Sequence, residues 1–144
     1  MQKKSTATIL TPVLVVSLSV FLAAQTLRVS IDIKPGDKPT TIEPGRQGLI
    51  PVAILTTSQF DAATVDAATV SIGPTGTEAA VFRSMLDDVD RDGDTDQLLL
   101  FRVQEMGVKC GDTVILLKGK TTDGKPIEGS QSIETVGCTG SAGQ

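Results

Sequence analysis

The sequence has no histidine, no tryptophan and no tyrosine, and its only aromatic side chains are four phenylalanines. Histidine is the commonest general base and transition-metal ligand, so its absence excludes Ser-His-Asp and Cys-His catalysis. Without Trp or Tyr, the chain also lacks the side chains on which sugar rings usually stack. The core must therefore be built from Val, Ile and Leu, which favour strands.

Basic residues are too few and too scattered for nucleic-acid binding. The chain has 13 Lys and Arg against 17 Asp and Glu, a formal net charge of −4. A nucleic-acid partner needs a dense Lys/Arg face to neutralise phosphates, and no such cluster is present. Composition thus excludes nucleic acid as a partner.

The N-terminus has the three parts of a secretory signal peptide. Lys3 and Lys4 form a positive end, an apolar run covers 9–24, and the small residues Ala23 and Ala24 precede the first polar stretch. We expect cleavage after Ala24, so that residues 1–24 are a signal peptide and the mature protein is secreted, periplasmic or at the cell surface. A membrane anchor is the alternative, but the run is shorter than the roughly 20 residues of a spanning helix. No stable membrane span is expected after cleavage.

Alternating apolar residues and frequent turn signals predict about seven short antiparallel strands. No segment longer than a turn has helical periodicity, and 58–68 is predicted as a loop or a single helical turn. Pro51 lacks an N–H donor and is expected at an edge strand or a bulge. The predicted strands cover 27–33, 49–55, 69–72, 80–86, 98–103, 113–118 and 127–136.

This pattern predicts an all-β fold, a single Ig-like β-sandwich over residues 25–138. A small β-barrel is the competing architecture, and the sequence leaves both open. The Gly- and Ser-containing residues 139–144 are expected to form a flexible tail.

Residues 88–96 carry five aspartates at two-residue spacing. Set against a calcium-binding loop, the first three occupy positions one, three and five, Gly93 takes the sixth position where the chain must turn sharply, and position seven supplies a backbone carbonyl. The sequence therefore predicts a Ca²⁺ site. Its ligands are the side chains of Asp88, Asp90, Asp92 and Asp96 and the carbonyl of Asp94.

The loop differs from a full EF-hand, because Leu99 stands where the bidentate Glu would be. The apolar residues that follow indicate a strand rather than an exiting helix, so the loop is expected to join two strands. Loss of the Glu predicts a weak affinity, roughly 10⁻⁴–10⁻⁵ M. The alternative is a solvated acidic turn, disfavoured because the aspartates repel one another with only Arg91 to relieve them.

Cys110 and Cys138 are the only cysteines. A hairpin turning at Asp123-Gly124 places opposite one another residues whose numbers sum to about 247, which puts Cys110 next to Cys138. Because export brings the chain into an oxidising compartment, a disulfide between them is predicted, with two free thiols as the alternative.

Several segments form a recognisable series: VSIDIKPG at 29–36, GLIPVAIL at 48–55, FD at 60–61, TVD at 64–66, GPTG at 73–76, GDT at 111–113 and GKTTDGKPIEG at 119–129. Together with the Asp-rich loop, they resemble a module of secreted bacterial and archaeal proteins, over about residues 28–136. The resemblance implies one domain among others in large exported or surface proteins. The loop is also similar to those of dockerins and of β-propeller calcium hairpins, but a dockerin needs two loops with helices.

The sequence thus favours an exported, non-enzymatic calcium-binding module used in surface structure, adhesion or assembly. Its expected partner is an unidentified extracellular protein or polysaccharide. A carbohydrate-binding module is the alternative, weakened by the missing Trp and Tyr. A hydrolase with paired carboxylates is disfavoured, because the dense carboxylates are better explained as calcium ligands.

Overall fold

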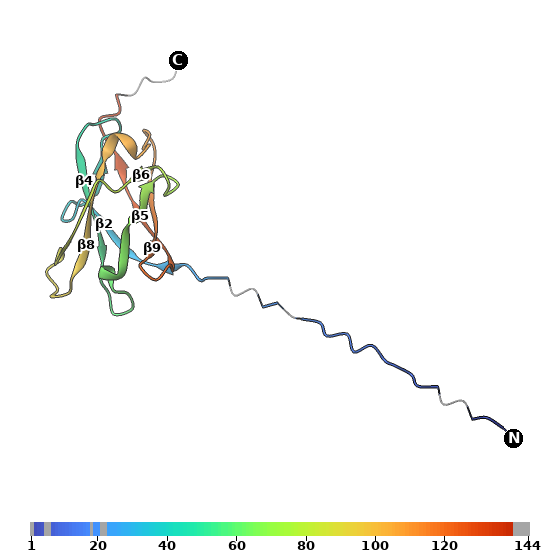
Figure 1. The fold of residues 1–144 in the computed structure, drawn as a ribbon. Helices are drawn as coiled ribbons and strands as arrows, with labels where there is room; N and C mark the ends of the chain where they lie inside the picture. The colour runs from blue at the N-terminus through green and yellow to red at the C-terminus, as the bar shows by residue number, and fades with distance from the viewer. Residues whose placement is uncertain (1, 5–6, 18, 21–22, 140–144) are drawn as a thin grey trace, which may run out of the picture.

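The computed structural model describes residues 2–4, 7–17, 19–20 and 23–139. Figure 1 shows a β-sandwich with the described residues before Leu27 running away from it as an extended trace. In these ranges no helix has the length and apolarity needed to cross a membrane. The expected tail falls on 139–144, of which 140–144 lie outside the described residues.

Three sheets make up the folded part. A five-stranded sheet has the order β1-β10-β9-β5-β6, a four-stranded sheet has the order β2-β4-β8-β7, and β11 pairs with β3 in a small third sheet. The elements are β1 Leu27–Arg28, β2 Ser30–Ile33, β3 Thr41–Ile42, β4 Leu49–Leu55, η1 Ala62–Thr64, β5 Val65–Gly73, β6 Ala79–Ala80, β7 Arg83–Asp87, β8 Asp96–Arg102, η2 Val103–Glu105, β9 Val114–Thr121, β10 Pro126–Ser132 and β11 Glu134–Thr135.

The predicted all-β sandwich is confirmed, and in the described residues the sheets do not close into a barrel. The pairings are antiparallel except β1 with β10 and β11 with β3. The number of strands was underestimated, because strands of two residues such as β3 and β11 carry no periodic pattern that a sequence can show.

The first predicted strand, 27–33, is divided between the two large sheets. β1 pairs with β10, the Val29 N–H donates to the Glu128 carbonyl (3.0 Å), and β2 then pairs with β4. Val29, Ile31 and Ile33 are buried, as their alternation predicts. One continuous alternating stretch thus ties both sheets to the core.

The expectation that Pro51 lies at an edge or a bulge is wrong, because β4 is an interior strand between β2 and β8. The Pro51 carbonyl accepts a hydrogen bond from the N–H of Lys34 (2.8 Å), and Lys34 is the residue just after β2 ends at Ile33. Since both backbone groups of a strand residue point to the same side, the missing donor of Pro51 faces a position where β2 has already ended. The nitrogen of Pro51 therefore faces no strand residue, as it would at a sheet edge, although β4 is an interior strand.

The core lies between the two large sheets and consists mostly of Val, Ile and Leu, as the composition predicts. Its largest fully buried side chain is the aromatic Phe101 on β8. The segment 58–68 contains the single helical turn η1. Its last residues, 65–68, begin β5, which is therefore longer than the predicted strand 69–72. β8 and β9 are interior strands of the four-stranded and the five-stranded sheet, respectively.

Candidate metal site

The acidic loop connects β7 to β8, so the prediction that it joins two strands is confirmed (Figure 1). The two strands form an antiparallel hairpin whose last registered pair is Asp87 with Asp96. Asp96 is therefore the first residue of β8 rather than a loop residue. The position of its carboxylate is set by the ladder of the four-stranded sheet.

Three of the five predicted ligands come together. Asp88, Asp90 and Asp96 each present a carboxylate oxygen, and these oxygens lie within 4.8 Å of one another. Two oxygens bound to one Ca²⁺ at 2.3–2.6 Å lie no more than about 5 Å apart across the ion, so this spacing fits a common cation. The group can hold a metal ion.

Asp96 is fully buried, and its two oxygens are fixed by backbone donors. The Thr56 N–H donates to Oδ1 (2.8 Å) and the Val89 N–H donates to Oδ2 (2.9 Å). In the described part of the chain, no Lys or Arg forms an ion pair with Asp88, Asp90 or Asp96. A buried carboxylate without a counter-charge is costly, and a bound cation would remove that cost.

Thr56 anchors the loop to the rest of the sheet, a role that the sequence did not reveal. Its hydroxyl donates to the Thr95 carbonyl (2.5 Å) and accepts from the Ala62 N–H (2.9 Å), while its own N–H binds Asp96. The β4–β8 ladder pairs Ile54 with Gln97, which places Thr56 beside the end of the acidic loop. Only this long-range register could have identified the residue.

The loop curls around the carboxylate of Asp88. Its Oδ1 accepts from the Asp92 N–H (3.1 Å) and its Oδ2 from the Gly93 N–H (3.1 Å). Gly93 has a φ of 95°, a left-handed value that favours glycine. The sharp turn predicted at the sixth position of the loop is therefore present.

The remaining two predicted ligands lie outside the three-carboxylate group. The Oδ1 of Asp92 accepts from the Asp94 N–H (2.9 Å), which closes a short turn within the loop. Asp94 was expected to contribute its carbonyl rather than its side chain. Coordination by Asp92 and by the Asp94 carbonyl stays a prediction.

The closely spaced aspartates of the loop affect the pKa of Asp90. Partial desolvation raises the pKa of Asp90, and the nearby carboxylates of Asp92 and Asp96 raise it further, while a hydrogen bond from the Asp92 N–H opposes the shift. Carboxylates that share a site without a cation disfavour each other's ionised form. The loop is thus charged beyond what its own residues compensate.

The predicted disulfide is confirmed, since Cys110 and Cys138 are joined with a Cα–Cα distance of 5.8 Å. In the β9–β10 hairpin the paired residue numbers sum to 246, for example Ser132 with Val114, close to the expected 247. The bond closes the open end of this hairpin, opposite its turn.

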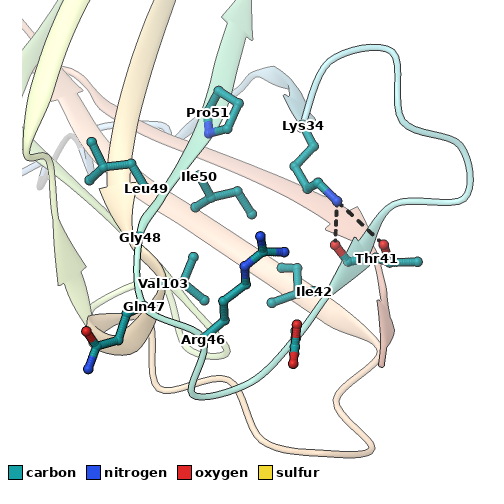
Figure 2. Close-up of a pocket in the computed structure, with 11 residues that line it drawn as sticks. Lys34, Thr41, Ile42, Arg46, Gln47, Gly48, Leu49, Ile50, Pro51 and Val103 are labelled. Carbon is teal, nitrogen blue, oxygen red and sulfur yellow. Dashed lines mark hydrogen bonds between the residues drawn. The ribbon is translucent and has the colours of Figure 1, made fainter. Parts of the chain in front are cut away.

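A pocket of about 290 Å³ lies away from the acidic loop, beside β3 and the start of β4. Figure 2 shows the Arg46 side chain reaching into it, while Lys34 donates from Nζ to the Thr41 carbonyl (3.1 Å) at its border. None of its eleven lining residues is aromatic. This pocket could not be predicted from the sequence, because its lining residues form no motif.

No family model matches the chain, and no curated protein is similar to it.

Proposed function

We propose that the protein is an exported, non-enzymatic module whose β7–β8 loop binds one calcium ion, and that the ion stabilises the domain for surface structure, adhesion or assembly outside the cell. The observation that carries this proposal is the buried Asp96 carboxylate, which meets Asp88 and Asp90 without a basic partner among the described residues. The group therefore has excess negative charge at a spacing that suits a cation.

Calcium is favoured over other ions by the chemistry of the donors. All three groups offer oxygen, which suits hard cations and not the softer transition metals. The loop spacing, with Gly93 at the turn, is that of a calcium loop, and Ca²⁺ accepts flexible geometry where Mg²⁺ demands a near-ideal octahedron. Export supports the same choice, since a weak site fills only where calcium is abundant.

The disulfide and the N-terminal sequence support an extracellular setting, because disulfides persist in oxidising compartments. The resemblance of residues 28–136 to a secreted module supports the same role. Carbohydrate binding remains the alternative function, and the pocket around Arg46 is where it would occur. The lack of aromatic residues there gives it no stacking surface.

Calorimetric titration and thermal unfolding test the proposal. Calcium at 100 times its dissociation constant should raise the free energy of unfolding by about 2.7 kcal/mol, and chelation should remove that gain. Asp88→Ala should abolish the calcium effect, and magnesium should replace calcium poorly. Asp92→Ala reveals whether Asp92 is also a ligand, because the three-carboxylate group does not include it.

Asp123→Asn is the matched control, since Asp123 lies in the turn of the β9–β10 hairpin. Its calcium response should equal that of the unchanged protein. Identical melting of the unchanged protein with calcium and with chelator would refute the proposal.

A further inference from the structure

The four-stranded sheet ends on one side in β7, a strand that nothing in the described residues covers. All five of its residues are exposed, including Met85 at 40% and Leu86 at 56%. An uncovered edge strand offers a row of unpaired N–H and C=O groups that can pair with another chain. β7 carries neither of the two residues that most often protect such edges, Lys and Pro.

The opposite edge of the same sheet is protected. At β2 the Ile33 N–H donates to the side-chain Oε1 of Gln131 (2.7 Å), which comes from the facing sheet. Gln131 in turn donates from Nε2 to the Thr40 hydroxyl (2.8 Å). Among the described residues, no side chain makes a comparable bond to the outward backbone groups of β7.

The register shows which backbone groups of β7 are free. At one end of the β4–β8 ladder the Val103 N–H donates to the Gly48 carbonyl (3.0 Å), so Val103 points toward β4. Because successive strand residues point to opposite sides, Leu98 and Leu100 point their backbone groups toward β7.

Met85 is paired with Leu98 and therefore uses its N–H and C=O on β8. Its neighbours Ser84 and Leu86 point theirs away from the sheet, toward solvent. The free edge thus offers two donors and two acceptors, centred on Met85.

We infer that β7 pairs with β7 of a second copy of this chain, antiparallel and about a two-fold axis at Met85. Ser84 of one copy then exchanges two backbone hydrogen bonds with Leu86 of the other, and the symmetric pair adds two more. The same register places Arg83 opposite Asp87 of the second copy and, by symmetry, Asp87 opposite Arg83 of the second copy. In this geometry both charged pairs occupy non-hydrogen-bonded positions, where side chains lie closest.

Charge selects this register over its neighbours. A shift of the second strand by two residues keeps the outward backbone groups matched. It places Arg83 or Asp87 opposite Met85 and leaves only one hydrogen-bonded pair within the two strands. A shift of odd number places donors and acceptors of the two strands out of phase. Neither Arg83 nor Asp87 forms an ion pair within the described part of the chain, so both are available.

The resulting interface is isologous and joins two four-stranded sheets into one of eight strands. It buries the exposed Met85 and Leu86, and symmetry pairs Met85 with itself. A strand pair of this length is small, so the dimer forms in a concentration-dependent way. The inference names a partner for the assembly role proposed above but requires no bound ion.

Sedimentation equilibrium on charge-reversed variants tests the interface. R83D makes positions 83 and 87 both negative, and D87R makes both positive. Each variant alone should stay monomeric at concentrations where the unchanged protein dimerises. An equimolar mixture should restore the dimer at least tenfold more strongly than either variant alone, as a heterodimer. Association driven by the N-terminal apolar segment would not respond to this pairing.

Ser84→Pro provides a second variant, since it removes an outward donor without touching the β7–β8 ladder. It should abolish dimerisation while leaving the melting temperature close to that of the unchanged protein. Lys120→Glu, on the other large sheet, is the charge control and should dimerise normally.

The mixing experiment is carried out with calcium and with chelator, and restoration is expected in both. A loop that binds no calcium would leave this result unchanged, so failure of the ion site and failure of the interface are distinguishable. An unchanged protein that is monomeric at all accessible concentrations would overturn the inference. So would single variants that dimerise normally, or a mixture that does not.

Discussion

Two hairpins of the sandwich, β9–β10 and β7–β8, hold their turns together in opposite ways. In the β9–β10 turn, hydrogen bonds from Thr121 and Lys125 to Asp123 lower the pKa of that carboxyl, and the charge of Lys125 adds to the effect. In the β7–β8 loop, partial desolvation and neighbouring carboxylates raise the pKa of Asp90. One turn compensates its acidic residue with its own side chains, and the other does not.

The surroundings of the hairpins follow the same division. β9 and β10 lie inside the five-stranded sheet, and the disulfide Cys110–Cys138 closes their open end. β7 lies at an edge, and within the described residues Thr56 anchors its loop to β4, by hydrogen bonds to the Asp96 carboxylate and to the Thr95 carbonyl. The first hairpin is complete within the chain. The second has free charge and free backbone groups, which is why an ion and a second copy are both proposed there.

Removing the disulfide is expected to give the largest effect on stability. The bond spans a sequence separation of 28, and the chain-entropy model assigns about 3–4 kcal/mol to closing a loop of this length. Cys110→Ser with Cys138→Ser should lower the free energy of unfolding by that amount, measured by urea denaturation.

The calcium-induced stabilisation should stay the same in this double variant, because distant sites contribute additively. Reducing agent should reproduce the loss in the unchanged protein and have no effect on the variant. A loss below about 1 kcal/mol would show that the hairpin is held by its neighbouring strands alone.

Local patterns carried most of what could be predicted. Alternation over 27–33 identified the side chains that β2 buries, the apolar run 49–55 identified β4, and the Asp-Gly turn located the β9–β10 hairpin well enough to pair Cys110 with Cys138. The acidic loop was predicted between strands from the apolar residues that follow it. These features depend on residues close together in the chain.

Long-range register could not be predicted in the same way. The interior position of Pro51 depends on β2 ending at Ile33, and the contact of Thr56 with Asp96 depends on the β4–β8 register. Asp96 joins Asp88 and Asp90 because the β7–β8 register fixes its position, whereas Asp92 accepts a local bond from the Asp94 N–H. A spacing rule treats all five aspartates alike, whereas the sheet fixes only the last of them.

Two glycines allow the ion's effect to be separated from backbone strain. Gly93 in the acidic loop and Gly111 beside the disulfide have φ values of 95° and 96°, and a Cβ atom at either would meet nothing within 4 Å. Substitution by Ala should cost each variant about 1–2 kcal/mol with chelator present, because left-handed backbone is unfavourable for L-residues.

Calcium should then distinguish the two variants. Gly93→Ala should gain less stability from calcium than the unchanged protein, since the strained turn must reshape the loop around Asp88. Gly111→Ala should gain as much as the unchanged protein does. Urea midpoints with calcium and with chelator measure both differences, and equal calcium gains in the two variants would contradict a site formed by this loop.

Acid should reveal the smallest effect, at Asp123. Because its folded-state pKa is lowered from 3.8, its ionised form contributes stability that is fully present above pH 3.8 and is lost as the pH falls through the lower folded-state pKa. Asp123→Asn removes this contribution while keeping an acceptor for the Thr121 hydroxyl. The variant should be slightly less stable than the unchanged protein at neutral pH, and the two should converge well below pH 3.8. A gap between their urea midpoints that persisted in strong acid would show that Asp123 acts through its shape rather than its charge, and the electrostatic contrast between the two turns would then rest on the acidic loop alone.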